Sequence, residues 1–251
     1  QAATVLAQGE MVGVKVAGGF GPVLFEPAQM TYLQQNPGAA ITAIASGFAD
    51  ALLADQLNTA VGCAVSAVEN VAALVNDVSA SAGVTQVGLN NSHRKFGDMS
   101  SVLSADVMTG DVYHRLVGEA IANSSSLFLS TNVKVVDILG KLFVISDIPA
   151  LYEAGSPNKD KVLSITSGGI IVDNSSDIVS NMETSNGKLR IETTWQADYT
   201  FGVKLKGYAW DVANGGASPT DAELFTGTNW DKAVTDNKHT LGTLLIGSAA
   251  A

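Results

Sequence analysis

"LRIETTWQADYTFGVKLKGYAW", residues 189–210, is the stretch that decides the fold. From Leu189 to Leu205 nearly every odd position is apolar, with Thr193 as the exception, and the even positions are polar, charged or Gly. Strict period-two alternation, with no Pro and no Asn-Gly or Asp-Gly pair inside it, predicts one unbroken β-strand over 189–205. Strands usually run roughly 3–10 residues. A strand of this length therefore predicts an elongated molecule.

The apolar positions change parity after Gly207, since Tyr208 and Trp210 lie at even numbers. A Gly inside a strand pattern indicates a bulge, so we expect the chain to bend here and to enter a different layer. The tail that follows is expected to hold turns, two anchoring aromatics at Phe225 and Trp230, and a closing strand. Asp231 and Lys232, directly after the second anchor, are interpreted as the start of a helix.

A long helix is predicted to begin at Pro37, with Asn36 as its N-cap. Apolar residues then recur three or four apart, as at Phe48 and Leu52, and carry the helix to Val61. Gly62 is expected to interrupt it before a second amphipathic stretch that starts near Val65.

The remaining segments predict a central sheet with helices beside it. Residues 1–30 are interpreted as turns and short strands, because Gly and Pro punctuate their Val alternation. A short helix is expected within 79–98 and another over 110–123, and strands are expected over 101–109, 140–149 and 161–175. The fold class that follows is α+β.

The composition narrows the classes of function. Of 251 residues, 24 are Asp or Glu and 14 are Lys or Arg, and the basic residues form no run. An acidic chain without a basic patch predicts neither sequence-specific nucleic-acid binding nor attachment to an anionic membrane. No apolar run reaches the roughly 18–20 residues of a membrane span. Hydrophobic residues make up 46% and charged residues only 15%, which suits a protein that hides surface against neighbours.

Chemistry-bearing residues form no recognisable catalytic, cofactor or metal site. We expect His93 to be solvated, His114 to lie on the polar side of its helix, and His239 to lie in the polar tail. No two of them share a metal-ligand spacing. The lone cysteine, Cys63, is expected to be a buried core thiol. Asp106 and Asp111 lie in different predicted elements, so no carboxylate pair is expected.

Several phrases in order resemble the major capsid proteins of tailed bacteriophages, including a prophage subgroup. The strand–helix–strand core "DVMTGDVYHRLVGEAI", "GKLFVISDIPAL" and "VLSITSGGIIVDNSSD" resembles the central part of that family. "LKGYAWDVANGGASPTDAELFTGTNWDK" resembles its C-terminal segment, and "VGVKVAGGFGPVLFEPAQ" and "QQNPGAAITAIASGFADALLADQLNTA" resemble the region around the long helix. The resemblance covers essentially the whole chain.

The resemblance implies the tailed-phage capsid fold, with a peripheral lobe that holds the spine helix and β-ribbon, and an axial lobe around a mixed sheet. It assigns residues 1–76 to the peripheral lobe, 77–179 to the axial lobe, 180–206 to the ribbon, and 207–251 to a segment packed on the axial lobe. Too few residues precede the long helix for the family's N-terminal arm and extended loop. We therefore expect the chain start to be a cleavage product or a truncation.

The resemblance also implies a structural, non-enzymatic protein that forms hexamers and pentamers of an icosahedral shell around double-stranded DNA. It implies a virion location, assembly in the bacterial cytoplasm, and scaffold, portal and maturation protease as possible partners. A nanocompartment shell protein that binds enzyme cargo is the alternative, and a β-rich hydrolase or sugar-binding domain is a remote one.

Two loops are expected to meet neighbouring subunits around the capsomer axis. Their candidate interface residues are Leu127 and Phe128 in one loop, and Leu151 and Tyr152 in the other, because exposed apolar side chains are costly unless covered. The residues expected to anchor the core are Phe48, Leu52, Trp195, Tyr199, Phe201, Trp210 and Trp230.

Overall fold

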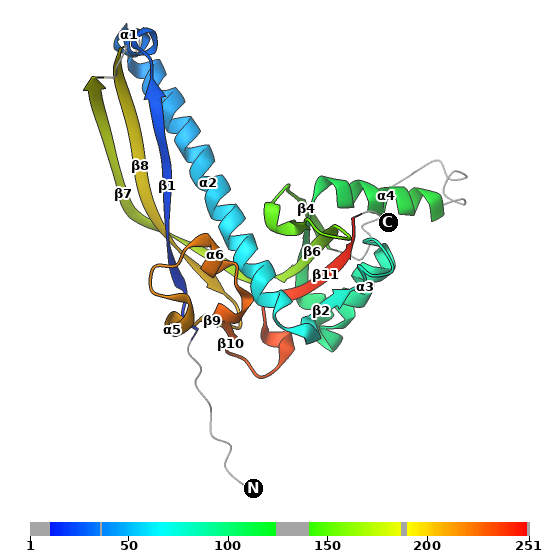
Figure 1. Ribbon diagram of the computed structural model, residues 1–251. Helices are drawn as coiled ribbons and strands as arrows, with labels where there is room; N and C mark the ends of the chain where they lie inside the picture. The colour runs from blue at the N-terminus through cyan, green and yellow to red at the C-terminus, as the bar shows by residue number, and fades with distance from the viewer. Residues whose placement is uncertain (1–10, 36, 124–140, 187–189, 250–251) are drawn as a thin grey trace.

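The computed structural model describes residues 11–35, 37–123, 141–186 and 190–249. The predicted long strand is β8, Ile191–Leu205, and it runs unbroken for 15 residues. It lies between β1 (Val14–Phe25) and β7 (Ile170–Asn186) in an antiparallel three-stranded sheet. The expectation of a continuous ribbon is therefore confirmed, and Figure 1 shows it as an arm that projects from the rest of the molecule.

The two strands that flank β8 differ from the sequence expectation. Residues 14–25 form one strand rather than turns and short strands, because the Gly-Pro punctuation is absorbed by a register shift between Phe20 and Val23, where Gly21 has φ +100°. The expected strand over 161–175 is two strands: β6 (Lys159–Thr166) and β7, with Gly168 between them at φ +65°. Since β7 pairs with β8 from Ile170 onward, the ribbon begins earlier than the boundary placed at residue 180.

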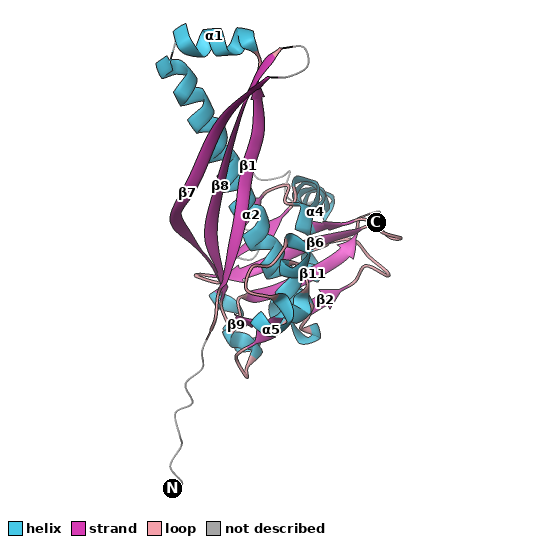
Figure 2. Ribbon diagram, turned by 60° about the vertical axis from the view of Figure 1, so that its left-hand side comes forward, coloured by secondary structure: helices cyan, strands magenta, loops and turns pink. Residues whose placement is uncertain are grey.

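The helix α2 (Pro37–Glu69) follows the short helix α1 (Pro27–Gln35) and is continuous for 33 residues. At 1.5 Å per residue it is roughly 50 Å long. It starts at Pro37 as predicted, but Gly62 does not interrupt it. A Cβ at residue 62 would lie 2.4 Å from Cε1 of Phe225, so the glycine serves close packing against that ring. Figure 2 shows α2 beside the three strands along the arm.

The second part of the molecule is a six-stranded mixed sheet. Its strand order is β2 (Val75–Asp77), β11 (Gly242–Ser248), β6, β3 (Leu103–Met108) and β4 (Leu142–Ile145), with β5 (Tyr152–Glu153) paired to β6. The helices α3 (Gln86–Arg94) and α4 (Gly110–Asn123) lie beside it (Figure 1). Short 3₁₀ turns occupy Ala72–Leu74, Gly97–Val102, Pro149–Leu151, Gly227–Asn229 and Asn237–His239.

A small junction unit connects the arm to this sheet. β8 ends before a turn at Gly207, where φ is +81°, and the chain enters β9 (Tyr208–Trp210), which pairs with β10 (Trp230–Lys232) in a separate sheet. The expected change of layer is thus confirmed. The expected helix start at Asp231 is wrong, because that residue pairs with Ala209 across the two strands. The helices α5 (Val212–Gly215) and α6 (Asp221–Leu224) complete the unit.

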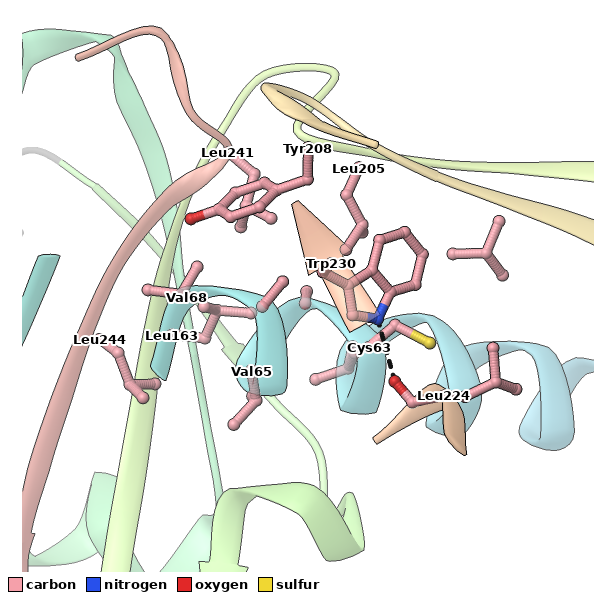
Figure 3. Close-up of a cluster of buried hydrophobic side chains, with 14 of the residues drawn as sticks. Cys63, Val65, Val68, Leu163, Leu205, Tyr208, Leu224, Trp230, Leu241 and Leu244 are labelled. Atoms are coloured by element: carbon pink, nitrogen blue, oxygen red, sulfur yellow. Dashed lines mark hydrogen bonds between the residues drawn. The ribbon is translucent and has the colours of Figure 1, made fainter. Parts of the chain in front are cut away.

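The main core lies where α2, the junction unit and the six-stranded sheet meet (Figure 3). Its largest buried side chains include Trp230 and Tyr208, and the Trp230 indole N–H donates to the carbonyl of Leu224 at 3.0 Å. Cys63 lies in this core as expected, and burial raises the pKa of its thiol to about 12. The end of α2 is therefore fixed in the core, while its beginning extends along the arm.

Candidate assembly surfaces

The arm is held together by an aromatic cluster between α2 and the sheet. The Phe48 ring lies 5.9 Å from the rings of both Trp195 and Tyr199, and 5.8 Å from Phe20. Phe201 stacks on Tyr199 at 6.4 Å, and Leu52 packs against the same continuous core. Edge-to-face ring pairs add roughly 0.5–1.5 kcal/mol each beyond the area they bury. The cluster therefore packs α2 firmly onto β1 and β8.

A polar contact fixes the position of α2 over the sheet. The Tyr199 hydroxyl donates to Oδ2 of Asp55 at 2.7 Å. Burial, together with this hydrogen bond, raises the pKa of Tyr199 above its usual value. A Cβ at Gly18 would lie 2.4 Å from Cε2 of Tyr199 and 2.7 Å from Oδ2 of Asp55. The phenol can therefore reach Asp55 because the facing residue of β1 has no side chain.

An ion cluster joins the end of α2 to the six-stranded sheet. Lys161, whose side chain is 9% exposed, lies 2.8 Å from carboxylate oxygens of both Glu69 and Glu153. The Lys161 hydrogen bond lowers the pKa of Glu153. Burial disfavours the charge on Lys161, but the hydrogen bonds to Glu153 and Glu69 outweigh it and raise the pKa of the amine. The arm is thus tied to the sheet by charge as well as by apolar packing.

The arm also exposes rows of large apolar side chains. On α2, Leu53 and Leu57 point to solvent, and Leu53 is 61% exposed. On β7, Ile178 and Met182 pair with Tyr199 and Trp195, so they share the face that α2 covers, yet each is more than half exposed. The helix therefore leaves this part of β7 uncovered. A large exposed apolar patch on a protein surface marks an interaction site.

The four candidate interface residues have different outcomes. Leu151 is fully buried in the main core, so the expectation that it meets a neighbouring subunit is wrong: its 3₁₀ turn packs it inward. Leu127 and Phe128 lie outside the described residues. Tyr152 is 45% exposed on β5 and remains a candidate.

The remaining anchors lie in the junction unit. The rings of Trp210 and Trp230 meet at 5.0 Å, and the Trp210 indole N–H donates to the carbonyl of Gly216. The residues that the sequence did not single out are Asp55, Gly18, Ile178 and Met182. An Asn-Gly pair at residues 186–187 favours a hairpin that ends in β8. Had that hairpin been predicted, its strand pairing would have placed Ile178 opposite Tyr199 and Met182 opposite Trp195.

One of the three histidines, His93, lies in a different environment from the one expected. His93 is buried and bonded to Asp106, whereas a solvated residue was expected, because α3 turns its polar side chains onto the sheet. His114 and His239 are exposed as expected. Across residues 11–35, 37–123, 141–186 and 190–249, no group of three His, Cys, Asp or Glu side chains is placed to hold a metal ion.

Residues Ile44–Glu69 of α2 are long and apolar enough to cross a membrane by length and composition alone, contrary to the sequence expectation. This criterion is weak for one helix, since 56% of the apolar window is buried inside the fold. A helix in the core of a protein has the same composition.

A family model for "Major capsid protein 13-like" proteins (Gp13-like) matches residues 1–244. The chain belongs to this family of major capsid proteins. No curated protein matches it. The fold agrees with the family: the cyanophage Pam1 capsid protein aligns with a TM-score of 0.51 at 11% identity, over 95% of this chain and 75% of that one.

A second solved structure with the same fold is an encapsulin and not a phage capsid protein. The SrpI encapsulin of Synechococcus elongatus, described as a holo complex, aligns with a TM-score of 0.50 at 9% identity. The alignment covers 93% of this chain and 73% of the encapsulin. The family match and the phage neighbour make this protein a capsid shell subunit with the tailed-phage capsid fold.

Proposed function

We propose that this capsid subunit assembles with copies of itself into hexamers and pentamers of an icosahedral shell that encloses double-stranded DNA. The observation that carries the proposal is the arm with its uncovered apolar rows. A lone subunit would expose Leu53, Ile178, Val179 and Met182 to water. Burial of apolar surface contributes roughly 25 cal/mol per Å², so subunit contacts over the arm are favoured.

The subunit's net charge supports the same proposal. A net charge of −10 would repel the phosphate backbone, which leaves the enclosed DNA free of strong wall contacts.

Tyr152 is proposed as a contact near the capsomer axis, together with Leu127 and Phe128. Assembly in the host cytoplasm, with scaffold, portal and protease as partners, belongs to the proposal as well. We infer that the subunit acts by assembly and carries no catalytic step.

Electron microscopy of the purified protein tests assembly directly. The wild-type chain is expected to form closed particles of uniform size. The double variant Ile178→Asp/Met182→Asp should stay as small oligomers, because it places two charges in the uncovered part of the arm. Val87→Asp is the matched control, since Val87 is exposed on α3, away from the arm. A wild-type protein that stays monomeric at all concentrations would contradict the proposal.

A nanocompartment shell that binds enzyme cargo is the second candidate, and the likeness to the SrpI encapsulin favours it. The two functions differ in what the shell encloses, which is double-stranded DNA in one case and an enzyme in the other. Shells purified from the natural source and analysed by mass spectrometry and nuclease protection separate them. Protected double-stranded DNA supports the phage shell, and one enriched enzyme with no DNA supports the compartment.

A further inference from the structure

The strand β7 leaves one long edge of the arm sheet without a neighbour. In the strand order β1-β8-β7 it is bonded on one side only, and Figures 1 and 2 both show it at the outer margin of the arm. Every side chain from Asp177 to Asn186 is exposed. An edge strand presents unpaired backbone N–H and C=O groups, which are a template for pairing with another chain. This part of β7 is therefore an open pairing site.

The sequence of this stretch does not protect the edge. Natural edge strands are usually blunted by Pro, by Lys, by a bulge or by short length. Residues 178–186, "IVSNMETSN", contain no Pro, Gly or Lys and a single charged residue, Glu183. They pair with β8 without interruption, because the register shift of β7 lies before them, between Asn174 and Ile178. The stretch is a regular strand with nothing that prevents a second strand from joining it.

The other edges of the described sheets are protected. β1 contains Pro22, which has no N–H to donate, and a register shift between Phe20 and Val23. In the six-stranded sheet the edge strands β2 and β4 have three and four residues, and β5 has two. The strands β9 and β10 have three residues each. In the described part of the chain, the one unprotected edge long enough to match β7 is therefore β7 of a second copy.

We propose that β7 of one subunit pairs with β7 of a second copy as antiparallel strands about a two-fold axis at Ser180. The pairing rests on the self-assembly proposed above and names one of its contacts. A two-fold interface uses the same patch on both subunits. Two copies of one strand that lie side by side about an axis normal to their sheet run antiparallel. The two three-stranded arm sheets thereby become one continuous sheet.

The apolar residues of β7 select this register. Ile178 and Met182 lie opposite Tyr199 and Trp195, so they belong to the face that α2 covers, and each is more than half exposed. With the axis at Ser180, Ile178 of each copy lies opposite Met182 of the other, at roughly 4.5–5.5 Å. An axis moved by one residue opposes both to polar side chains. An axis moved by two leaves one of them opposite a polar residue.

Cysteine cross-linking on the complete chain tests the pairing, because the native Cys63 is buried. In Ser180→Cys the two introduced thiols lie opposite each other at the axis, within reach of a disulfide. In the matched variant Ser185→Cys they lie about ten residues apart along the strands, or roughly 33 Å. Both serines are exposed, so neither change disturbs the core. Under mild oxidation, Ser180→Cys should give at least ten times more disulfide-linked dimer than Ser185→Cys.

One repulsive contact in this register allows a second test. Glu183 of each copy lies close to Asp177 of the other, and like charges on opposing strands are destabilising. In the Ser180→Cys background, Glu183→Lys replaces this repulsion with attraction and should raise the initial rate of cross-linking at low salt at least three-fold. Asp198→Lys is the matched control, because it makes the same change of charge on β8, one strand away from the edge. Its rate should stay within two-fold, and equal rates for the two lysine variants would overturn the register.

Two results of the cysteine test would overturn the pairing itself. One is the absence of cross-linked dimer from Ser180→Cys, and the other is an equal yield from Ser185→Cys, which indicates random collision. Electron microscopy of the same samples before oxidation separates this test from the proposed function. Particles that give no Ser180→Cys dimer would refute the pairing and leave shell assembly intact. Cross-linked dimers from a protein that forms no particles would support the pairing and contradict shell assembly.

Discussion

Gly18→Ala should destabilise the arm although it adds a single methyl group. The new Cβ would lie 2.4 Å and 2.7 Å from Cε2 and Cζ of Tyr199, and 2.7 Å from Oδ2 of Asp55. The Tyr199 ring has little freedom to move, because Phe48 and Phe201 contact it on other sides. The methyl group must therefore displace the ring or the backbone of β1.

The magnitude follows from three contributions. Overpacking a tight site costs roughly 1–3 kcal/mol. Weakening the hydrogen bond from Tyr199 to the Asp55 carboxylate removes part of the roughly 1.5–3 kcal/mol of a charged hydrogen bond. Replacing Gly by Ala returns roughly 0.4–1 kcal/mol through the unfolded chain. The net loss in unfolding free energy is about 2 kcal/mol. For a chain of this size it corresponds to a fall in Tm of about 4–8 °C.

The assay is thermal unfolding monitored by circular dichroism, with Gly19→Ala as the matched control. Gly19 is the next residue on the same edge strand but points to the opposite face, where its added Cβ would meet a movable Asp198 oxygen at 3.2 Å. We expect its Tm to stay within about 2 °C of the wild type, or to rise. A Gly18→Ala protein as stable as Gly19→Ala would show that Tyr199 and Asp55 do not fix the helix over the sheet.

Three further variants test other contacts. Gly47→Ala should stabilise the protein by about 0.5–1 kcal/mol in urea unfolding, because helix propensity improves and a Cβ there meets nothing within 4 Å; a loss of stability would contradict this. Gly62→Val in the same helix should instead lose about 1–2 kcal/mol, since its Cβ would lie 2.4 Å from the Phe225 ring, and the double variant with Phe225→Ala should recover most of the loss. Lys161→Met should lose about 1–2 kcal/mol at pH 7, with the partly exposed carboxylates limiting the effect. Because the pKa of Glu153 is lowered from 4.5 in the folded state, the wild type loses this contribution as the pH falls below about 4.5, and the difference between the two proteins should shrink there.

The sequence predicted the elements whose side chains alternate cleanly. From Ala197 to Leu205 every second residue of β8 is buried, so its period-two pattern is strong. The helix α2 begins at a Pro, which cannot continue a preceding helix. β1 and β7 were harder, because they are the edges of the arm. β7 is largely exposed, so few buried positions impose a pattern on it, and β1 contains the glycines that Tyr199 and the register shift require.

His93 shows why candidate sites are harder to predict than elements. Its neighbours Asn90, Asn91, Arg94 and Lys95 are polar, and they led to the expectation of a solvated residue. The informative signal was elsewhere, in the acidic Asp106 within the strand "LSADVM", whose other buried positions are all apolar. A carboxylate in a buried strand requires a partner, and the nearest short polar helix was the place to look for one.

The positions of the polar contacts show how this subunit holds its arm in a fixed position relative to the six-stranded sheet. Where α2 crosses from the arm into the core, apolar packing is supplemented by Tyr199–Asp55 on one side and Lys161 with its two carboxylates on the other. Both contacts resist sliding of the helix along its axis, since each has a fixed partner on a different sheet. The helix α3 lies beside β11 and β2 at the side of the six-stranded sheet away from the arm (Figure 1), where Leu89 packs into a second apolar cluster and Ser92 and His93 contact the sheet.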